Sequence, residues 1–217
     1  MSYVFLQCVN EECRFRFPAP AGETVAALSC PRCRSSLTFV AEAERRAASA
    51  TQHPAGAPEV VGLLDNIRSI HNVGSIFRSA DGAGVAHLHL AGITATPDHP
   101  RLVKAALGAH ETVRWTYHRN ALDAAQLLRA QGYRLVALEP AADGPAPFAP
   151  RPADRLALVV GNERAGVDPG VLALCDAVLS LPMSGRKTSL NAAVAFGIGV
   201  YYLRYRERLA PNDHGKE

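Results

Sequence analysis

From Val60 onward, short apolar runs rich in β-branched residues alternate with longer stretches whose apolar residues recur at helical spacing. Runs such as VVGLLD and RLALVVG predict buried strands, and ALDAAQLLRAQG predicts an amphipathic helix. Alternation of this kind is typical of βα units around a mostly parallel sheet. The sequence therefore predicts an α/β fold for most of the chain.

The last predicted helix begins near Ser189 and carries small and apolar residues along one face. Small residues allow another helix to approach closely, so this face suits either burial in the core or a dimer interface. The sequence leaves both alternatives open. The residues of this face are Leu190, Ala193, Val194, Gly197, Ile198 and Tyr201.

The beginning of the chain has a different composition, with four of the five cysteines in the first 33 residues. After Val40 the segment AEAERRAASATQHPAGAP is rich in alanine, polar residues and proline, as linkers are. A chain of 217 residues accommodates one full domain and a small appendage. We predict a small domain over residues 1–40, a linker over 41–58 and an α/β domain over 59–217.

The cysteines form two pairs, Cys8-x4-Cys13 and Cys30-x2-Cys33, that are candidate ligands of one tetrahedral zinc ion. Four thiolates leave no open coordination position, so the predicted site is structural, and it would supply much of the folding free energy of so small a domain. The alternative, ordinary thiols, stays open because the first pair is widely spaced. Cys175 stands apart in a predicted apolar helix and is expected to be a core residue.

Composition narrows the function only slightly. A net charge of +3 gives a mild preference for a polyanionic partner. No stretch approaches the roughly 18 apolar residues of a membrane span, and Glu11, Glu12 and Arg14 interrupt any signal-peptide run. We therefore expect a cytoplasmic protein with reduced thiols.

A first motif, LLDNIRSIHNVGSIFRSADGAGV, joins a strand ending at Asp65 to a helix expected to begin near Asn72. Asn72 is a candidate cap of that helix, and Gly74 allows another backbone to approach. Arg78 lies six residues further on. Its guanidinium suits bidentate binding of a phosphate, although a solvated surface charge is the alternative for a single arginine.

A second motif, LALVVGNERAGV, is an apolar strand that ends at Gly161 and turns through Asn162, Glu163 and Gly166. Ligands of open α/β sheets bind beyond the carboxyl ends of the strands, so this turn is a candidate floor for a nucleoside-sized ligand. The turn lacks both the G-x-G-x-x-G pattern and the G-x-x-x-x-G-K-[ST] pattern. Dinucleotide binders and nucleoside triphosphatases are therefore disfavoured.

A third motif, LSLPMSGRKTSLNAAVAFGI, predicts a strand to Met183, a polar loop, and then Ser189 and Asn191 at the start of the last helix. Their side chains either cap the helix or face a ligand. In this order, residues 72–80, 161–166 and 182–191 resemble the SpoU (TrmH-type) branch of the SPOUT methyltransferase superfamily. That branch carries N-x-G-x-I-x-R-x-A, G-N-E-x-x-G and P-M-x-G-x-x-x-S-L-N segments.

The resemblance covers roughly residues 60–203 and implies a parallel sheet with a C-terminal trefoil knot, an exception to the rule against threading. It also implies S-adenosylmethionine as methyl donor, a ribose 2′-hydroxyl of transfer or ribosomal RNA as acceptor, and a homodimer whose active site lies near the seam. The implied cofactor-binding residues are Leu138, Gly161, Asn162, Leu181, Met183 and Leu190. The implied catalytic residues are Arg78, Asn72, Glu163, Ser189 and Asn191.

A ribose hydroxyl is a poor nucleophile, so its proton must leave or its developing charge must be stabilised. A guanidinium is almost impossible to deprotonate in a protein. We therefore expect Arg78 to orient the target and stabilise negative charge. Glu163 either accepts the proton or fixes its turn.

The cysteine-rich domain is not part of the usual SpoU core, so RNA recognition does not carry over from the resemblance. Exposed cations are expected to contact the RNA backbone. A non-catalytic RNA-binding protein with the same fold is the competing function, and methylation of a base by another SPOUT branch is disfavoured. In the α/β domain these cations are Arg101, Lys104, Arg114, Arg186 and Lys187. In the cysteine-rich domain Arg14, Arg16, Arg32 and Arg34 accompany Phe15 and Phe17, either as an RNA surface or as solvated arginines over a core.

Overall fold

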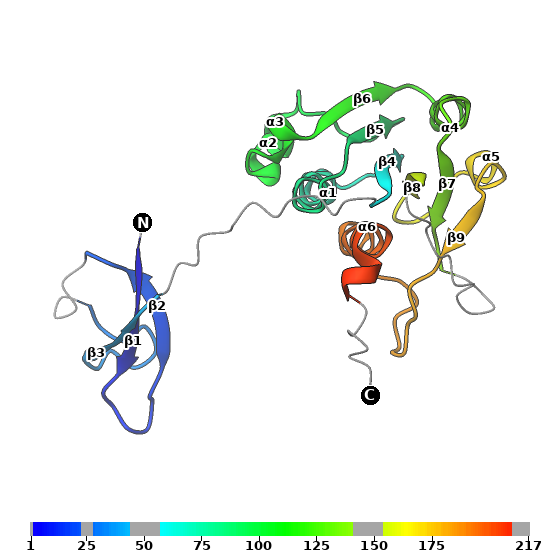
Figure 1. Cartoon of the computed structure of the whole chain (residues 1–217). Coiled ribbons are helices and arrows are strands. Elements are labelled where there is room, and N and C mark those ends of the chain that lie inside the picture. Colours follow the sequence, from blue (N-terminus) through cyan, green and yellow to red (C-terminus); the bar gives the residue numbers. More distant parts are fainter. Residues whose placement is uncertain (1, 23–27, 44–56, 141–153, 210–217) are drawn as a thin grey trace, which may run out of the picture. The chain divides into compact units, whose positions relative to one another are not determined.

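The computed structural model describes residues 2–22, 28–43, 57–140 and 154–209. The chain divides into two compact units, Met1–Gln52, called here the cysteine unit, and His53–Glu217, called the sheet unit (Figure 1). Most of the predicted linker, residues 44–56, lies outside the described residues.

The cysteine unit is a three-stranded antiparallel sheet in the order β2-β1-β3. Its strands are β1 (Tyr3–Cys8), β2 (Arg16–Pro20) and β3 (Leu37–Glu42). Side chains alternate between the two faces of a strand, so Leu6 and Cys8 of β1 point into a small core while Phe5 and Gln7 point to the opposite face. The buried core residues are Leu6, Cys8, Ala19, Cys30 and Leu37.

The sheet unit contains six parallel strands in the order β6-β5-β4-β8-β7-β9, which confirms the predicted α/β class. The central strands are buried over nearly their whole length because helices cover both faces of the sheet. The strands are β4 (Glu59–Asp65), β5 (His87–Ala91), β6 (Arg114–His118), β7 (Arg134–Leu138), β8 (Arg155–Val160) and β9 (Ala177–Leu179).

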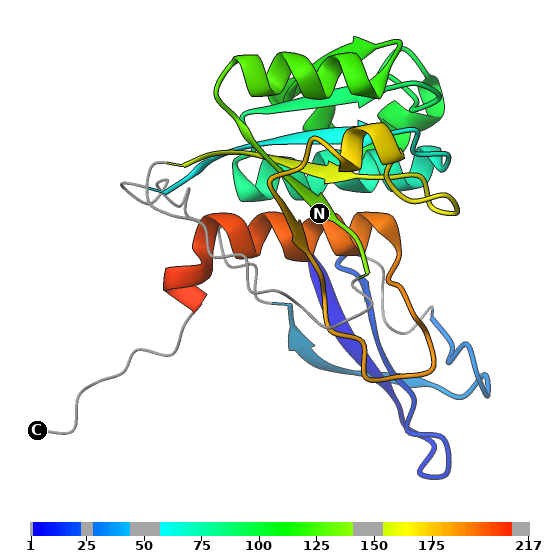
Figure 2. The same ribbon diagram turned by 90° about the vertical axis from the view of Figure 1, so that its right-hand side faces the viewer.

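The helices pack in two layers (Figure 2). Helices α1 (Ile70–Ala83), α2 (Pro100–Ala106), α3 (Ala109–Thr112) and α6 (Ala192–Leu209) contribute to one apolar cluster. Helices α4 (Ala121–Ala130) and α5 (Pro169–Leu172) contribute to the cluster on the opposite face. Within the described residues, none of these helices has both the length and the apolar character that a bilayer span requires.

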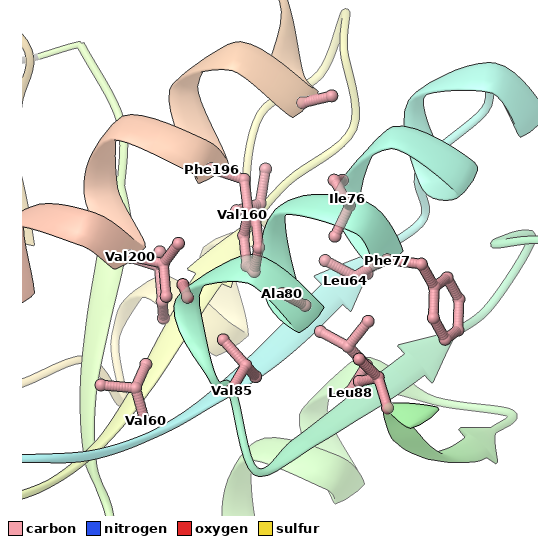
Figure 3. Packing of buried hydrophobic residues seen from close by; sticks show 14 of the residues in the cluster. Val60, Leu64, Ile76, Phe77, Ala80, Val85, Leu88, Val160, Phe196 and Val200 are labelled. Carbon is pink, nitrogen blue, oxygen red and sulfur yellow. The ribbon is translucent and has the colours of Figure 1, made fainter. Parts of the chain in front are cut away.

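The larger cluster joins α1 and α6 to the central strands. Phe196 and Val200 of α6 are fully buried and lie with Val160 of β8 and Ala80 of α1 in this layer (Figure 3). Gly62 of β4 leaves room for this packing, because a Cβ there would come within 3.1 Å of the Phe196 ring. Helix α6 is therefore anchored to the sheet by one face only.

Helix α1 begins at Ile70, two residues before the predicted start near Asn72. Ser69 is the N-cap, and its Oγ accepts a hydrogen bond from the Asn72 backbone N–H at 3.3 Å. The prediction that Asn72 caps the helix is therefore wrong. Its side chain is free to point away from the helix end.

The third motif has less regular structure than predicted. Strand β9 ends at Leu179 rather than Met183, and α6 begins at Ala192 rather than Ser189. The Asn191 side chain caps α6, because its Oδ1 accepts hydrogen bonds from the second and third N–H groups of the helix at 2.9 and 3.3 Å. The loop between β9 and α6 forms part of the wall of a cavity.

Cys175 lies beyond the end of α5 at Leu172, so its predicted place inside a helix is wrong. The side chain is half-buried against the smaller apolar cluster, and its Sγ donates to the Val171 carbonyl at 3.4 Å. Burial raises the pKa of the Cys175 thiol to about 11, so the thiol stays protonated near neutral pH. These contacts are those of a packing residue.

Candidate cofactor pocket and zinc site

A cavity of about 840 Å³ lies at the carboxyl ends of β7 and β8. Its wall is formed by the ends of these strands, the turn after β8, the loop after β9 and the start of α6. The volume falls within the range of small-molecule sites, about 300–1,000 Å³. All six predicted cofactor positions line it: Leu138, Gly161, Asn162, Leu181, Met183 and Leu190.

The floor of the cavity is a tight turn made largely of backbone. The backbone N–H groups of Asn162 and Gly166 each donate to the other residue's carbonyl, at 2.9 and 2.8 Å. Gly166 has a φ of +77°, and a Cβ on Gly161 would overlap the backbone of Gly166 and Val167. Both glycines are therefore required by the close approach of the two arms of the turn.

Two acidic side chains that sequence reasoning missed hold this turn in place. Asp65, only 1% exposed at the end of β4, accepts a hydrogen bond from the Asp168 N–H at 2.7 Å. Glu139, just after β7, accepts from the Val167 N–H at 2.6 Å and also lines the cavity. Asp65 is the last residue of an apolar strand and Glu139 directly follows one. An acidic residue at such a position is the sequence signal that could have identified them.

Glu163 caps the beginning of α1 from the turn after β8. Its Oε2 accepts a hydrogen bond from the Arg68 N–H at 2.8 Å, and its Oε1 accepts from the Ser69 N–H at 3.0 Å and from Asn72 Nδ2 at 2.9 Å. Burial opposes ionisation of Glu163, but these donors outweigh it and leave the pKa of the carboxyl lowered. A carboxylate held in this way fixes the turn and is a poor proton acceptor.

The same hydrogen bonds continue into the third motif. Asn72 Oδ1 accepts from Asn191 Nδ2 at 3.0 Å, and Asn191 in turn caps α6. The side chains of Glu163, Asn72 and Asn191 thus form one chain of hydrogen bonds that joins the three motifs at the cavity wall. Ser189 also lines the cavity.

Among the predicted catalytic and cofactor-binding residues, Arg78 is the one that does not line the cavity. It is exposed on α1, six residues beyond Asn72, which corresponds to about 9 Å along the helix axis. A single copy of the chain therefore brings together Asn72, Glu163, Ser189 and Asn191 and leaves Arg78 apart from them.

The predicted apolar face of α6 is not part of the core of one chain. Val194, Ile198 and Tyr201 are 51%, 46% and 41% exposed, whereas Ala193 turns into the core. Together with Ser75 and Ser79 of α1, the exposed side chains line a shallow groove. The sequence left open whether this face is buried in the core or forms a dimer interface. For Val194, Ile198 and Tyr201, the structure excludes burial in the core of one chain.

In the cysteine unit, the four predicted metal ligands converge. The Sγ atoms of Cys8, Cys13, Cys30 and Cys33 all lie within 4.8 Å of one another, with separations of 3.4 Å for Cys8 to Cys33 and 3.8 Å for Cys13 to Cys30. Sulfurs around a tetrahedral zinc at about 2.3 Å stand about 3.8 Å apart. The donor set and its spacing fit zinc, and the described residues contain no other such group of three or more ligands.

The two cysteine turns share a hydrogen-bond pattern but not a ligand position. In the turn of residues 30–34, the Arg34 N–H donates to the Cys30 carbonyl at 2.9 Å. In the turn of residues 10–14, the Arg14 N–H donates to the Asn10 carbonyl at 2.9 Å. Asn10 therefore takes the place that Cys30 has, and the fourth candidate ligand is Cys8, at the end of β1.

The sequence profile of the SpoU rRNA Methylase family matches residues 59–201. The chain belongs to this family. The match lies within the sheet unit and includes all three motifs. The SpoU turn, 161–166, and the SpoU segment that follows β9 are the parts that build the cavity.

Individual SpoU-family proteins are similar to this chain over the same region. RlmP of Bacillus subtilis, a 23S rRNA (guanosine(2553)-2′-O)-methyltransferase, is 35% identical over 143 residues, which are 65% of this chain and 56% of RlmP. The tRNA (guanosine(18)-2′-O)-methyltransferase of Thermus thermophilus is 30% identical, covering 70% of this chain and 77% of that protein. The aligned region thus spans little more than half of RlmP.

A solved structure of an AdoMet-bound rRNA methyltransferase from Sinorhizobium meliloti resembles this SpoU-family chain with a TM-score of 0.64 and 30% sequence identity. The likeness covers 73% of this chain and 60% of that protein. It agrees with the parallel α/β architecture described above.

Proposed function

We propose that this chain is an S-adenosylmethionine-dependent methyltransferase that modifies a ribose 2′-hydroxyl of transfer or ribosomal RNA. The observation that carries the proposal is the hydrogen-bonded chain of Glu163, Asn72 and Asn191 beside a nucleoside-sized cavity. Relatives that are 35% and 30% identical to this chain are named as 2′-O-methyltransferases of ribosomal and of transfer RNA, so both RNA classes are retained.

The cavity is the proposed site of S-adenosylmethionine, which supplies a methyl group on a positively charged sulfur. Leu138, Leu181, Met183 and Leu190 offer apolar surface to an adenine ring. The backbone around Gly161 offers hydrogen-bonding groups at its edge. Recognition through backbone is supported by Gly161 and Gly166, which carry no side chain and bring the backbone of the turn to the cavity.

For the reaction itself, we assign Glu163, Asn72 and Asn191 to positioning. Glu163 already accepts three hydrogen bonds, so its proposed role is to hold the start of α1 against the cavity. Ser189, in the loop that lines the cavity, is proposed to face the substrate. Arg78 is proposed to bind the target phosphate and stabilise the charge that develops on the ribose oxygen.

Because Arg78 lies apart from the cavity of its own chain, we propose a homodimer in which it serves the cavity of a second copy. The exposed apolar strip of Val194, Ile198 and Tyr201 on α6 is the proposed seam. It begins close to Asn191, beside the cavity wall. A contiguous apolar strip that is exposed in one chain is typical of a protein–protein interface.

The proposal also includes features implied by the resemblance or by the residues. We propose that the C-terminal part of the sheet unit is knotted as a trefoil, which is supported by a cavity built from β7, β8 and the loop after β9. We propose that Cys8, Cys13, Cys30 and Cys33 hold a structural zinc ion, that the domains are residues 1–40 and 59–217, and that the protein works in the cytoplasm.

The test is transfer of labelled methyl from S-adenosylmethionine to transfer and ribosomal RNA, followed by nucleoside analysis. We expect label on a ribose oxygen, and loss of that label in Arg78→Ala but not in Arg119→Ala, an exposed arginine away from the motifs. Binding of S-adenosylmethionine with no transfer to either RNA class would replace the proposal with the non-catalytic RNA-binding function.

Mixing two inactive variants tests the dimer. Arg78→Ala retains an intact cavity, and Asn72→Ala retains an intact Arg78. If Arg78 acts across the seam, a mixed dimer contains one complete site and recovers part of the parent activity. If Arg78 acts on its own chain, every site in the mixture lacks one residue and no activity returns.

A further inference from the structure

Two arginines of the cysteine unit occupy positions where glycine would be more stable. Arg14 and Arg34 each follow the second cysteine of a pair, and their φ angles are +45° and +66°. A residue with a Cβ is unfavourable in this left-handed region, whereas glycine enters it without penalty. Long cationic side chains held at both places indicate a role beyond folding.

These two residues belong to a cluster of cations at the cysteine end of the unit. Arg32 lies between the cysteines of the second pair, and Arg16 begins β2 opposite Gln7. All four arginines are exposed, and none forms an ion pair with another described residue. Their guanidinium groups are therefore available to an external anion.

Aromatic rings lie beside these cations. Phe5 is on the sheet face opposite the core, and the Arg16 guanidinium lies 5.9 Å from the centre of its ring. Phe15, between Arg14 and Arg16, is 38% exposed and stacks on Phe17 with ring centres 5.6 Å apart. Phe17 pairs with Leu6 on the core face, so Phe15 is also on that face and Phe5 is on the other. Each face thus presents a ring next to a cation.

We infer that the cysteine unit binds an unpaired segment of RNA, with Arg14 and Arg34 holding phosphates and the exposed ring of Phe15 stacking a base. A ring between cations suits a single strand, in which unpaired bases alternate with phosphates. A duplex is disfavoured because its stacked bases are not available to the ring. The inference rests on the proposed function in taking RNA as the substrate.

The experiment measures binding of a fluorescent, unstructured RNA oligonucleotide to the full zinc-loaded chain over a range of salt concentrations. Arg14→Gly/Arg34→Gly removes two phosphate contacts and the unfavourable φ angles together. At 0.15 M salt we expect about a tenfold loss of affinity, and the slope of log K against log salt falls by about 1.4. Thermal stability and zinc content stay the same or rise.

Matched variants separate the contributions of charge, ring and fold. Arg14→Lys/Arg34→Lys keeps the charges and is expected to retain most of the affinity. Phe15→Leu keeps apolar bulk without a ring face and is expected to weaken binding, whereas Val9→Ala, at an exposed residue at the same end, leaves it unchanged. Unchanged RNA affinity in folded Arg14→Gly/Arg34→Gly would overturn the inference.

Other outcomes also decide between the alternatives. Loss of zinc in the glycine variant would mean that the arginines neutralise the metal–thiolate charge, and tighter binding of duplex than of single-stranded RNA would exclude the stacking surface. If the parent and Arg14→Gly/Arg34→Gly transfer methyl groups with the same KM for RNA, this inference is wrong and the proposed function stands. If Arg14→Gly/Arg34→Gly loses salt-dependent RNA binding but neither protein transfers methyl groups, the proposed function is wrong and this inference stands.

Discussion

Different interactions stabilise the folded state of each of the two units. Among its described residues, the cysteine unit buries only five hydrophobic residues, two of which are cysteines. The sheet unit covers both faces of a six-stranded sheet with apolar clusters. A domain of about 40 residues buries too little surface to fold on apolar packing alone. The stability of the cysteine unit should therefore depend on the proposed zinc ion, and the stability of the sheet unit on its apolar core.

Removing the metal is expected to have the largest effect. Structural zinc binds zinc-finger peptides with about 10–16 kcal/mol, and that free energy is folding free energy. A chelator, or Cys8→Ser, should abolish amide protection in the cysteine unit while calorimetry shows an unchanged transition for the sheet unit. Cys175→Ser is the matched control and should retain zinc. Unfolding of the sheet unit when zinc is removed would show that the two units do not depend on different interactions.

Opening a cavity in the other core is expected to have the next largest effect. Phe196 is fully buried between α6 and the sheet, and truncation of such a ring costs about 3–5 kcal/mol. Denaturant unfolding of Phe196→Ala should show this loss in the sheet unit, with zinc content unchanged. Phe39→Ala, 52% exposed in the cysteine unit, should change stability by less than about 0.5 kcal/mol.

Acid should weaken the sheet unit through a buried histidine. Burial, and then the neighbouring His87 and His118, lower the pKa of His89 from 6.5 to about 4. The unfolded chain takes up this proton at a higher pH than the folded chain does. Stability is therefore lost as pH falls from about 6.5 to 4, by on the order of 2 kcal/mol after allowance for screening.

The measurement for His89 is the free energy of unfolding against pH. His89→Asn should flatten the dependence in this window, and His71→Asn, at an exposed residue of α1, should not. Equal slopes in the parent and His89→Asn would show that other groups control the acid response.

A smaller effect is expected at the cap of α1. The Glu163 carboxylate accepts hydrogen bonds from three N–H groups. In Glu163→Gln, the side-chain NH₂ group faces at least one of these donors and cannot accept its hydrogen bond. We expect a loss of about 1–2 kcal/mol in the sheet unit, measured by denaturant unfolding, with Glu111→Gln as an exposed control. Unchanged stability together with a shifted pH profile of methyl transfer would make Glu163 a proton acceptor instead.

The fold was predictable where local and tertiary signals agree. The central strands read as continuous apolar runs because both faces of the sheet are covered. Strand β6 was missed because it is an edge strand whose residues, such as Arg114 and Tyr117, are largely exposed and leave no apolar run. The start of α1 was misplaced because Ser69 and Asn72 are both good capping residues, and only the fold selects between them.

The candidate site was predictable as a set of motif residues but not as a set of contacts. All six predicted cofactor positions reach one cavity, because the ends of parallel strands meet at one sheet edge. The separation of Arg78 from that cavity follows from its position six residues beyond Asn72 along α1, but a motif does not say which of its residues line the cavity. The support from Asp65 was missed because its partner, Asp168, lies 103 residues away in the sequence.

Asn10 has a consequence for how the metal site tolerates change. Its carbonyl and side chain shape the first cysteine turn as Cys30 shapes the second, although the sulfur comes from Cys8 two residues earlier. A descendant with cysteine at both positions 8 and 10 would offer five thiolates for four coordination positions. Either sulfur would then be dispensable, so the fourth ligand of the proposed zinc ion would be able to move from strand to turn while four thiolates are always present.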